Sequence, residues 1–178
     1  EQAAIDSAYD NFPAQHNVLF ISGAGNRRPP RVCPPATCYN GIGVGAYVAP
    51  VNYSSVGPTL DNGRCKPDLT APSAETSFST PQVAGAAAIL MQAGLRGDGG
   101  SDTNSAADIR TVKALLLNGA VKPIGWTNSN SSPLDARYGA GVLNVFNAYE
   151  QLVGGKHGYI ENTVTTSVSN GAHPPTDA

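Results

Sequence analysis

The chain has 178 residues, of which 40% are hydrophobic and only 13% charged, and its formal net charge is −2. Such a composition is typical of a globular domain with its own core, and it excludes an intrinsically disordered chain. The small net charge, without an extended cluster of lysines and arginines, gives no electrostatic basis for binding nucleic acid or an anionic membrane. No apolar run reaches the roughly 18 residues of a membrane span. We therefore expect no nucleic-acid partner and no membrane partner.

The first segments predict a helix and then a strand. Residues 1–12 have the apolar periodicity of an amphipathic helix, which Pro13 should end. The side chains on its apolar face are Ala4, Ile5, Ala8 and Phe12. Residues 18–21 are a short apolar run, typical of a strand that is buried on both faces of a parallel sheet. Small residues follow up to Asn26, and small residues at the carboxyl end of a strand let a ligand approach closely.

The loop after this strand is rich in proline and carries Cys33 and Cys38, with Cys65 further along the chain. The spacing favours a Cys33–Cys38 disulfide in an oxidising compartment, with free thiols weighed about equally. Cys65 would then be unpaired, or would replace one of the other two in the pair. A metal site needs more ligands than this stretch offers, so we expect no metal and no cofactor. Sequons for glycosylation begin at Asn52 and Asn130, and the low charge is compatible with a secreted or extracellular protein.

The middle of the chain predicts two more strands and a central helix. Residues 44–48 and 66–71 read as strands, the second ending at Pro72. Residues 83–91 are apolar and uncharged, so we expect a buried helix with Pro81 in its first turn.

The hydroxyls upstream of this helix have two interpretations. Ser77 and Ser79 are placed to cap its free N–H groups. The positive end of a helix dipole also suits a serine nucleophile that generates an oxyanion. Pattern alone favours the cap, and it does not choose among Ser73, Ser77 and Ser79 as a nucleophile.

The last part of the chain predicts a polar loop over residues 93–106 and a helix over residues 107–120. Candidate caps for that helix lie in residues 102–105. The side chains spaced for burial on it are Ile109, Val112, Leu115 and Leu116. A final helix is expected over residues 144–153, followed by a linker or tail over residues 154–178. The predicted division is therefore one domain, residues 1–153, and one tail, residues 154–178.

Three segments, in the correct order, resemble subtilisin-like serine proteases. Residues 76–85, Thr-Ser-Phe-Ser-Thr-Pro-Gln-Val-Ala-Gly, resemble the nucleophile motif Thr-Ser-x-(Ser/Ala)-x-Pro-His-Val-Ala-Gly. Residues 18–26 resemble the family's strand that ends in Ala-Gly-Asn, and residues 138–145 resemble its closing Gly-x-Gly-x-(Val/Ile)-Asn segment. The resemblance implies that Ser77 is the nucleophile and that Asn26 donates its amide to the oxyanion. It also implies that the substrate's side chain lies along Ser22, Gly23 and Ala24.

The resemblance covers only the later part of such a domain, because the family's Asp and His motifs precede it. None of His16, His157 and His173 stands in the expected His-Gly-Thr context, and Asp6-Ser7 lies within a helical pattern. We therefore expect an incomplete α/β fold, a parallel sheet flanked by helices whose N-terminal strands are missing, which leaves an exposed sheet edge. The chain alone should not cleave peptides efficiently, and an N-terminal part of the same peptidase domain is the expected partner besides a peptide or protein substrate.

Two substitutions depart from the family pattern. Glu75 replaces the glycine before Thr-Ser, where a carboxylate opposes a developing oxyanion, and Gln82 replaces a histidine that is not the catalytic one. The segment over residues 72–76 is also short, which suggests an open cleft. The resemblance favours a serine endopeptidase. A non-catalytic binding or structural domain with the same fold is the alternative, supported by Glu75, and a small-molecule α/β enzyme is disfavoured by the three ordered matches.

Overall fold

The computed structural model describes residues 2–27, 31–48, 54–130 and 132–155. Within them a parallel sheet runs in the order β1 (Ile21–Gly23), β2 (Ile42–Tyr47) and β3 (Leu69–Pro72). Ile21 lies opposite Ile42, and Val44 lies opposite Leu69. The predicted class, a parallel sheet flanked by helices, is confirmed as a partial α/β fold. Asn52 and residues 156–178 lie outside the described residues.

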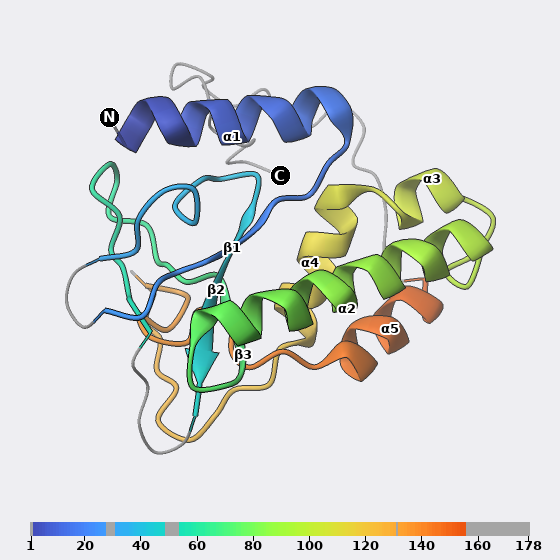
Figure 1. The fold of residues 1–178 in the computed structure, drawn as a ribbon. Helices are drawn as coiled ribbons and strands as arrows, with labels where there is room; N and C mark the ends of the chain where they lie inside the picture. Colours follow the sequence, from blue (N-terminus) through green and yellow to red (C-terminus); the bar gives the residue numbers. More distant parts are fainter. Residues whose placement is uncertain (1, 28–30, 49–53, 131, 156–178) are drawn as a thin grey trace.

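Five helices accompany the sheet in the described part of the chain. They are α1 (Gln2–His16), α2 (Thr76–Arg96), α3 (Thr103–Ala106), α4 (Ile109–Gly119) and α5 (Val145–Val153). Helix α2 packs along the strands, and α4 and α5 pack against α2 and each other (Figure 1). One hydrophobic cluster joins them, with Val44 and Leu69 from the strands and Leu90 from α2 at its centre. Among the described residues no helix has the length and apolar character needed to cross a membrane.

The strands occur where the sequence predicted them, with shifted ends. β1 starts at Ile21, not at Val18, because the carbonyl of Phe20 is the first group to accept a hydrogen bond from β2, at 2.8 Å from the Ile42 nitrogen. β1 is also an edge strand among the described residues and is only half buried, so burial on both faces is not what the structure shows. β2 starts two residues earlier than predicted.

Helix α1 continues through Pro13 to His16, which corrects the predicted end at Phe12. A proline inside a helix removes one hydrogen bond, and the rest of the helix persists around it. The residue after the helix, Asn17, adopts a positive φ of 51° and donates its N–H to the Pro13 carbonyl at 3.0 Å. Asparagine is among the residues that tolerate this conformation best.

The buried face of α1 is polar, and the predicted apolar face is exposed. Asp6 accepts a 2.7 Å hydrogen bond from the Thr37 hydroxyl, and Asp10 accepts one of 2.7 Å from the Asn40 backbone N–H. These two carboxylates are buried together with Pro13, whereas Phe12 remains 45% exposed. Specific hydrogen bonds to the loop after β1 therefore set the orientation of the helix, and apolar periodicity does not.

Helix α2 differs from the predicted helix in length and in burial. It starts at Thr76, so that Ser77, Ser79 and Pro81 all lie inside it, and it ends at Arg96, with Gly97 as a C-cap in the left-handed conformation. One face is buried against the sheet. The other face is exposed and carries small residues together with Ile89, which is 55% exposed. The expectation of a fully buried helix is therefore wrong for the described residues.

The helices after α2 occur where they were predicted, but the cap of α4 does not lie in residues 102–105. α4 buries the four apolar side chains expected of it, and its N-cap is Asp108, whose carboxylate accepts from the Arg110 N–H. The predicted loop before it contains the last turn of α2 and the short helix α3, which Asp102 caps. α5 begins at Val145 with Asn144 as its N-cap. The boundary between a domain and a tail remains a prediction, because residues 156–178 are outside the described part.

The three cysteines are free thiols, so the favoured Cys33–Cys38 disulfide is not formed. Cys33 is exposed and donates weakly to the Arg31 carbonyl at 3.5 Å. Cys38 is buried with its sulfur facing Gly41, where an added Cβ would lie only 2.6 Å from it. The two thiols therefore face different surroundings, and burial raises the pKa of Cys38.

The closing segment before α5 extends the sheet beyond β3. The N–H of Thr70 donates to the Gly141 carbonyl at 2.8 Å, and the N–H of Leu143 donates to the Thr70 carbonyl at 2.7 Å. Gly139 has a positive φ of 57°, and a Cβ there would collide with the backbone carbonyl of Asp68. A glycine is required at this position on both counts. This contact holds the C-terminal part of the chain against the segment that leads to α2.

Candidate active site

The start of α2 meets the carboxyl ends of the strands. A Cβ placed on Gly23, at the end of β1, would lie 3.1 Å from the side-chain oxygens of Thr76 and Thr80 in the first turns of α2. Figure 1 shows the first turn of α2 beside the carboxyl end of β3, which is joined to it by a short connection. The small residue at the end of β1 is therefore what allows the helix to approach.

Asn26 caps α2 from 50 residues away in the sequence. Its side-chain Oδ1 accepts a 2.7 Å hydrogen bond from the backbone N–H of Thr76. The N-cap residue itself is Glu75, in an extended conformation, and its side chain makes no capping hydrogen bond. The predicted capping by Ser77 or Ser79 is therefore wrong. A free N–H in the first turn of a helix is usually bound by a hydroxyl close in the sequence, but here the Thr76 N–H is bound by Asn26.

The other N–H groups of this first turn are used unequally. Phe78 and Ser79 both donate to the Glu75 carbonyl, at 3.1 and 3.2 Å. The Ser77 N–H has no acceptor among the described residues, and neither has the side-chain amide nitrogen of Asn26. The Ser77 N–H and the Asn26 amide are therefore two free donors, one on each side of the hydrogen bond between Thr76 and Asn26. Both lie at the positive end of a 21-residue helix.

The structure distinguishes the three candidate serines. The hydroxyl of Ser73 donates to the Glu75 carbonyl. Ser79 is fully buried, and its hydroxyl faces the carbonyls of Glu75 and Thr76 at 3.5 and 3.4 Å. Ser77 is exposed, and its hydroxyl has no partner in the part of the chain that the structure describes. Of the three, Ser77 alone has an exposed hydroxyl without a hydrogen-bond partner among the described residues.

Pro81 and Gln82, which follow the first turn of α2, affect the helix around Ser77. Pro81 lies four residues after Ser77 and has no N–H to donate to the Ser77 carbonyl. The Gln82 amide donates to the Pro72 carbonyl at 2.9 Å and to the Phe78 carbonyl at 3.0 Å, which ties α2 to the end of β3. The sequence pattern gave Gln82 little weight, and only the fold shows this bridge.

The residues expected to contact a substrate side chain lie at the end of β1. Ser22 is half buried and Gly23 is exposed. Ala24 is 3% exposed, donates its N–H to Val44 at 2.8 Å, and belongs to a small apolar cluster. Ser22 and Gly23 are thus the more accessible of the three.

No general base is brought to Ser77 by the residues that the structure describes. His16 lies at the end of α1 and packs on the Phe12 ring, with 4.3 Å between ring centroids. Asp6 is 7% exposed and accepts a hydrogen bond from the Thr37 hydroxyl, so it has a structural role in α1. His157 and His173 fall outside the described residues. The described side chains also form no group of three or more potential metal ligands.

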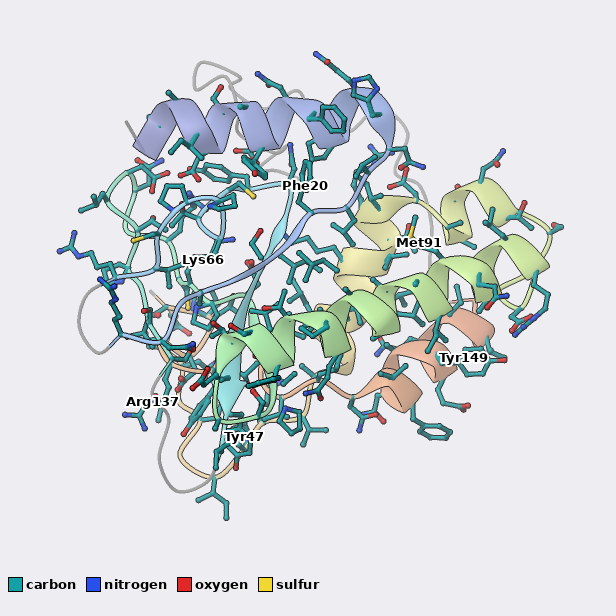
Figure 2. The ribbon with its side chains drawn as sticks, in the orientation of Figure 1. Phe20, Tyr47, Lys66, Met91, Arg137 and Tyr149 are labelled. Atoms are coloured by element: carbon teal, nitrogen blue, oxygen red, sulfur yellow. The ribbon has the colours of Figure 1, made fainter. Side chains whose placement is uncertain are left out.

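A buried ion pair lies in the segment that leads to Ser77. The Lys66 ammonium lies 2.7 Å from Asp68 and donates to the Cys38 carbonyl at 2.8 Å, and Figure 2 shows Lys66 in the interior beside the strands. Burial alone would raise the pKa of Asp68, but the charges of Lys66 and Lys113 and the Gly43 N–H outweigh it and lower the pKa. A buried carboxylate kept ionised in this way fixes β2 against the start of β3.

Comparisons with known proteins identify the family and support the fold. The model of the Subtilase family matches residues 1–141. Among solved structures, the self-cleaved protease domain of PatA is 28% identical with a TM-score of 0.63, and the alignment covers 84% of this chain and 55% of that one. The prenylagaramide maturation protease PagA is 28% identical with a TM-score of 0.61, covering 80% of this chain and 53% of its own.

Tripeptidyl peptidase 2 is also similar, at 28% identity and a TM-score of 0.63, with 82% of this chain and 12% of that chain covered. The chain thus spans about half the length of the PatA protease domain that it matches. The family model covers most of the 178 residues, and the structural neighbours are protease domains of similar fold. The chain belongs to the Subtilase family.

Proposed function

We propose that this chain is the nucleophile-bearing part of a serine endopeptidase. The hydroxyl oxygen of Ser77 attacks the carbonyl carbon of the scissile peptide bond, and its proton passes to a histidine base outside the described residues. The amine leaves with that proton, and water then hydrolyses the acyl-enzyme. The observation that carries the proposal is that Ser77 has both an exposed hydroxyl and an unused backbone N–H at the start of α2.

Asn26 supports this proposal through the same hydrogen bond that caps the helix. Because its oxygen is bound to Thr76, its amide nitrogen is left as a donor. In combination with the Ser77 N–H, that donor would stabilise the oxyanion of the tetrahedral intermediate. Preorganised donors of this kind contribute about 10²–10³ in rate each. Ser22, Gly23 and Ala24 would line the cleft for the substrate side chain.

The catalytic His and Asp would come from an N-terminal part of the same peptidase domain. Two features support such a partner: β1 has an unpaired edge among the described residues, and one face of α2 is exposed although it carries apolar side chains. An extra strand on β1 and a segment over α2 would cover both. We further propose that the protein is secreted or extracellular. No metal or cofactor is required by this mechanism.

The alternative is a non-catalytic binding or structural domain with the same fold, and Glu75 is the observation that favours it. Its carboxylate stands two residues before Ser77, where it opposes negative charge that develops on a substrate oxygen.

Covalent labelling with a fluorophosphonate, read by native mass spectrometry and peptide mapping, separates the two functions. For an assembled peptidase we expect one adduct, on Ser77, and a complex that contains the N-terminal part. An assembled protein that takes up no label would contradict the peptidase and support the binding domain.

Two variants of Asn26 separate its roles. Asn26→Asp keeps the oxygen that accepts from Thr76 but lacks the amide donor, whereas Asn26→Ala loses both. If the amide binds the oxyanion, both variants lower kcat by about 10²–10³. If Asn26 only caps the helix, Asn26→Asp should retain most of the rate and of the thermal stability.

A further inference from the structure

We propose that Glu75 makes this site select substrates with a lysine or arginine side chain on the residue whose carbonyl is attacked. The inference rests on the proposed peptidase function and adds a specificity to it. Glu75 lies two residues before Ser77, so their Cα atoms are at most about 7.6 Å apart. A glutamate side chain can therefore reach a group bound next to the Ser77 hydroxyl.

The backbone of Glu75 is held rigidly at the edge of the site. Its carbonyl accepts hydrogen bonds from the N–H groups of Phe78 and Ser79 and from the Ser73 hydroxyl. Its φ of −136° and ψ of 149° are ordinary extended values, so the position does not need glycine and imposes no strain on a longer side chain. The Glu75 carboxylate is therefore attached to a rigidly held backbone position two residues before Ser77.

The side chain of Glu75 is not engaged within the described part of the protein. It is exposed, it makes no capping hydrogen bond to α2, and none of the four ion pairs found among the described residues includes it. Structural carboxylates elsewhere in the chain behave differently, as Asp108 does when it caps α4 and pairs with Arg110 at 2.8 Å. A carboxylate without an internal partner, next to the nucleophile, is available to a ligand.

Glu75 is linked through Thr76 to the end of β1, the segment that the proposed function assigns to the substrate's acyl side chain. Thr76, the next residue, contacts the end of β1 at Gly23 and is bonded to Asn26. By the proposed function, this end of β1 lines the pocket for the side chain before the cleaved bond. Glu75 therefore lies at the border between that pocket and the oxyanion donors.

The charge of Glu75 affects the reaction in two opposite ways. With a neutral substrate, the carboxylate repels the negative charge that develops on the attacked oxygen, and the transition state is destabilised. A cationic side chain in the adjacent pocket attracts the carboxylate and cancels that repulsion. The preference should accordingly appear in kcat as well as in KM.

The test compares internally quenched peptides that differ at one position, lysine against its neutral isostere norleucine, with acetylated N-termini, on the full-length protein. We expect kcat/KM to be about tenfold higher for lysine, the size of an exposed charge-assisted contact. Glu75→Gln should bring the ratio close to one, by slowing the lysine peptide and speeding the norleucine peptide. Glu75→Asp keeps the charge and should keep a preference for lysine.

Glu150→Gln is the matched control, because it removes the same charge from an exposed position on α5 and should leave the ratio unchanged. A ratio that is the same in Glu75→Gln and in the unmodified protein, with Ser77 still labelled by a fluorophosphonate, would overturn this inference alone. Absence of both labelling and cleavage would overturn the proposed peptidase, and this inference with it.

Discussion

At the scale of single residues, Asp10 is the side chain whose charge is least well accommodated. It is 1% exposed, and its Oδ2 has no hydrogen-bond partner among the described residues. Burial raises its pKa, and the nearby charge of Asp6 adds to the effect, although N–H groups of Asn40 and Tyr39 partly compensate. The folded state therefore favours the protonated carboxyl, so that this group's contribution to stability is complete at acid pH and is lost as pH rises through the raised pKa.

We predict that Asp10→Asn stabilises the folded protein near neutral pH by about 1 kcal/mol, since a buried unsatisfied charge is replaced by a neutral amide. The gain should shrink as pH falls through the raised pKa of Asp10, because the wild-type carboxyl then becomes protonated as well. Thermal unfolding between pH 4 and pH 7.5 measures both effects. A gain of the same size at every pH would show that titration of Asp10 is not its cause.

Asp61 is the opposite case, because its pKa is lowered in the folded protein whereas that of Asp10 is raised. Partial burial alone would raise its pKa, but hydrogen bonds with Thr59 and Arg64 lower it, and Arg64 pairs with it at 2.9 Å. Asp61→Asn should therefore destabilise the protein at neutral pH and have less effect in acid, because the stability that an ionised carboxylate contributes is lost as pH falls through its lowered pKa. Thermal unfolding of Asp10→Asn and Asp61→Asn across the same pH range shows whether the pH dependence of stability comes from the surroundings of these two carboxyls.

At the scale of elements, the connection between β3 and α2 determines where Ser77 points. The Gln82 amide bridges the Pro72 carbonyl at the end of β3 and the Phe78 carbonyl in the first turn of α2. We predict that Gln82→Met, which keeps the size of the side chain, costs about 1 kcal/mol of stability and slows fluorophosphonate labelling of Ser77 several-fold. Gln92→Met is the control, because Gln92 is exposed on the same helix and makes no hydrogen bond in the described contacts. Equal labelling rates in the two variants would show that Gln82 does not position Ser77.

The sequence predicted the elements better than it predicted which faces they bury. The strands, α4 and α5 were found within a few residues because apolar runs and caps such as Asn144 are local signals. Helix α1 was assigned the wrong buried face, since the bonds of Asp6 and Asp10 to the loop after β1 are tertiary and leave no periodic pattern. Pattern alone was equally unable to show that Asn26 caps α2.

The identification of a candidate nucleophile also depends on tertiary contacts that local sequence signals do not show. The family resemblance pointed to Ser77, whereas local chemistry left Ser73, Ser77 and Ser79 equivalent. The structure separates them by what each hydroxyl contacts: Ser73 and Ser79 face backbone carbonyls, and Ser77 is exposed. These contacts depend on the exact start of α2, and element boundaries are the feature that a sequence specifies least well.

At the scale of the whole molecule, two surfaces of the described chain resemble interfaces more than solvated faces. One is the unpaired edge of β1, and the other is the exposed face of α2. That face combines Gly85 and neighbouring alanines with Ile89, and an added Cβ at Gly85 would meet no atom within 4 Å. A row of small residues allows another element to pack closely against a helix. Burial of the large apolar side chain of Ile89 under that element would stabilise the contact.

Substitution of Gly85 by leucine tests whether this face is covered in the full-length protein, because the two possibilities predict opposite signs. On a helix face that remains open, Gly85→Leu should stabilise the protein by roughly 0.8 kcal/mol, since leucine is a much better helix former than glycine. Under a closely packed N-terminal part, the added side chain should overpack the interface and destabilise the protein by about 1–3 kcal/mol. We expect destabilisation, together with weaker labelling of Ser77 where the two parts separate. Ala114→Leu adds a similar side chain to the exposed face of α4 and should change the unfolding free energy little, so that a stabilised Gly85→Leu protein would refute the two-part assembly.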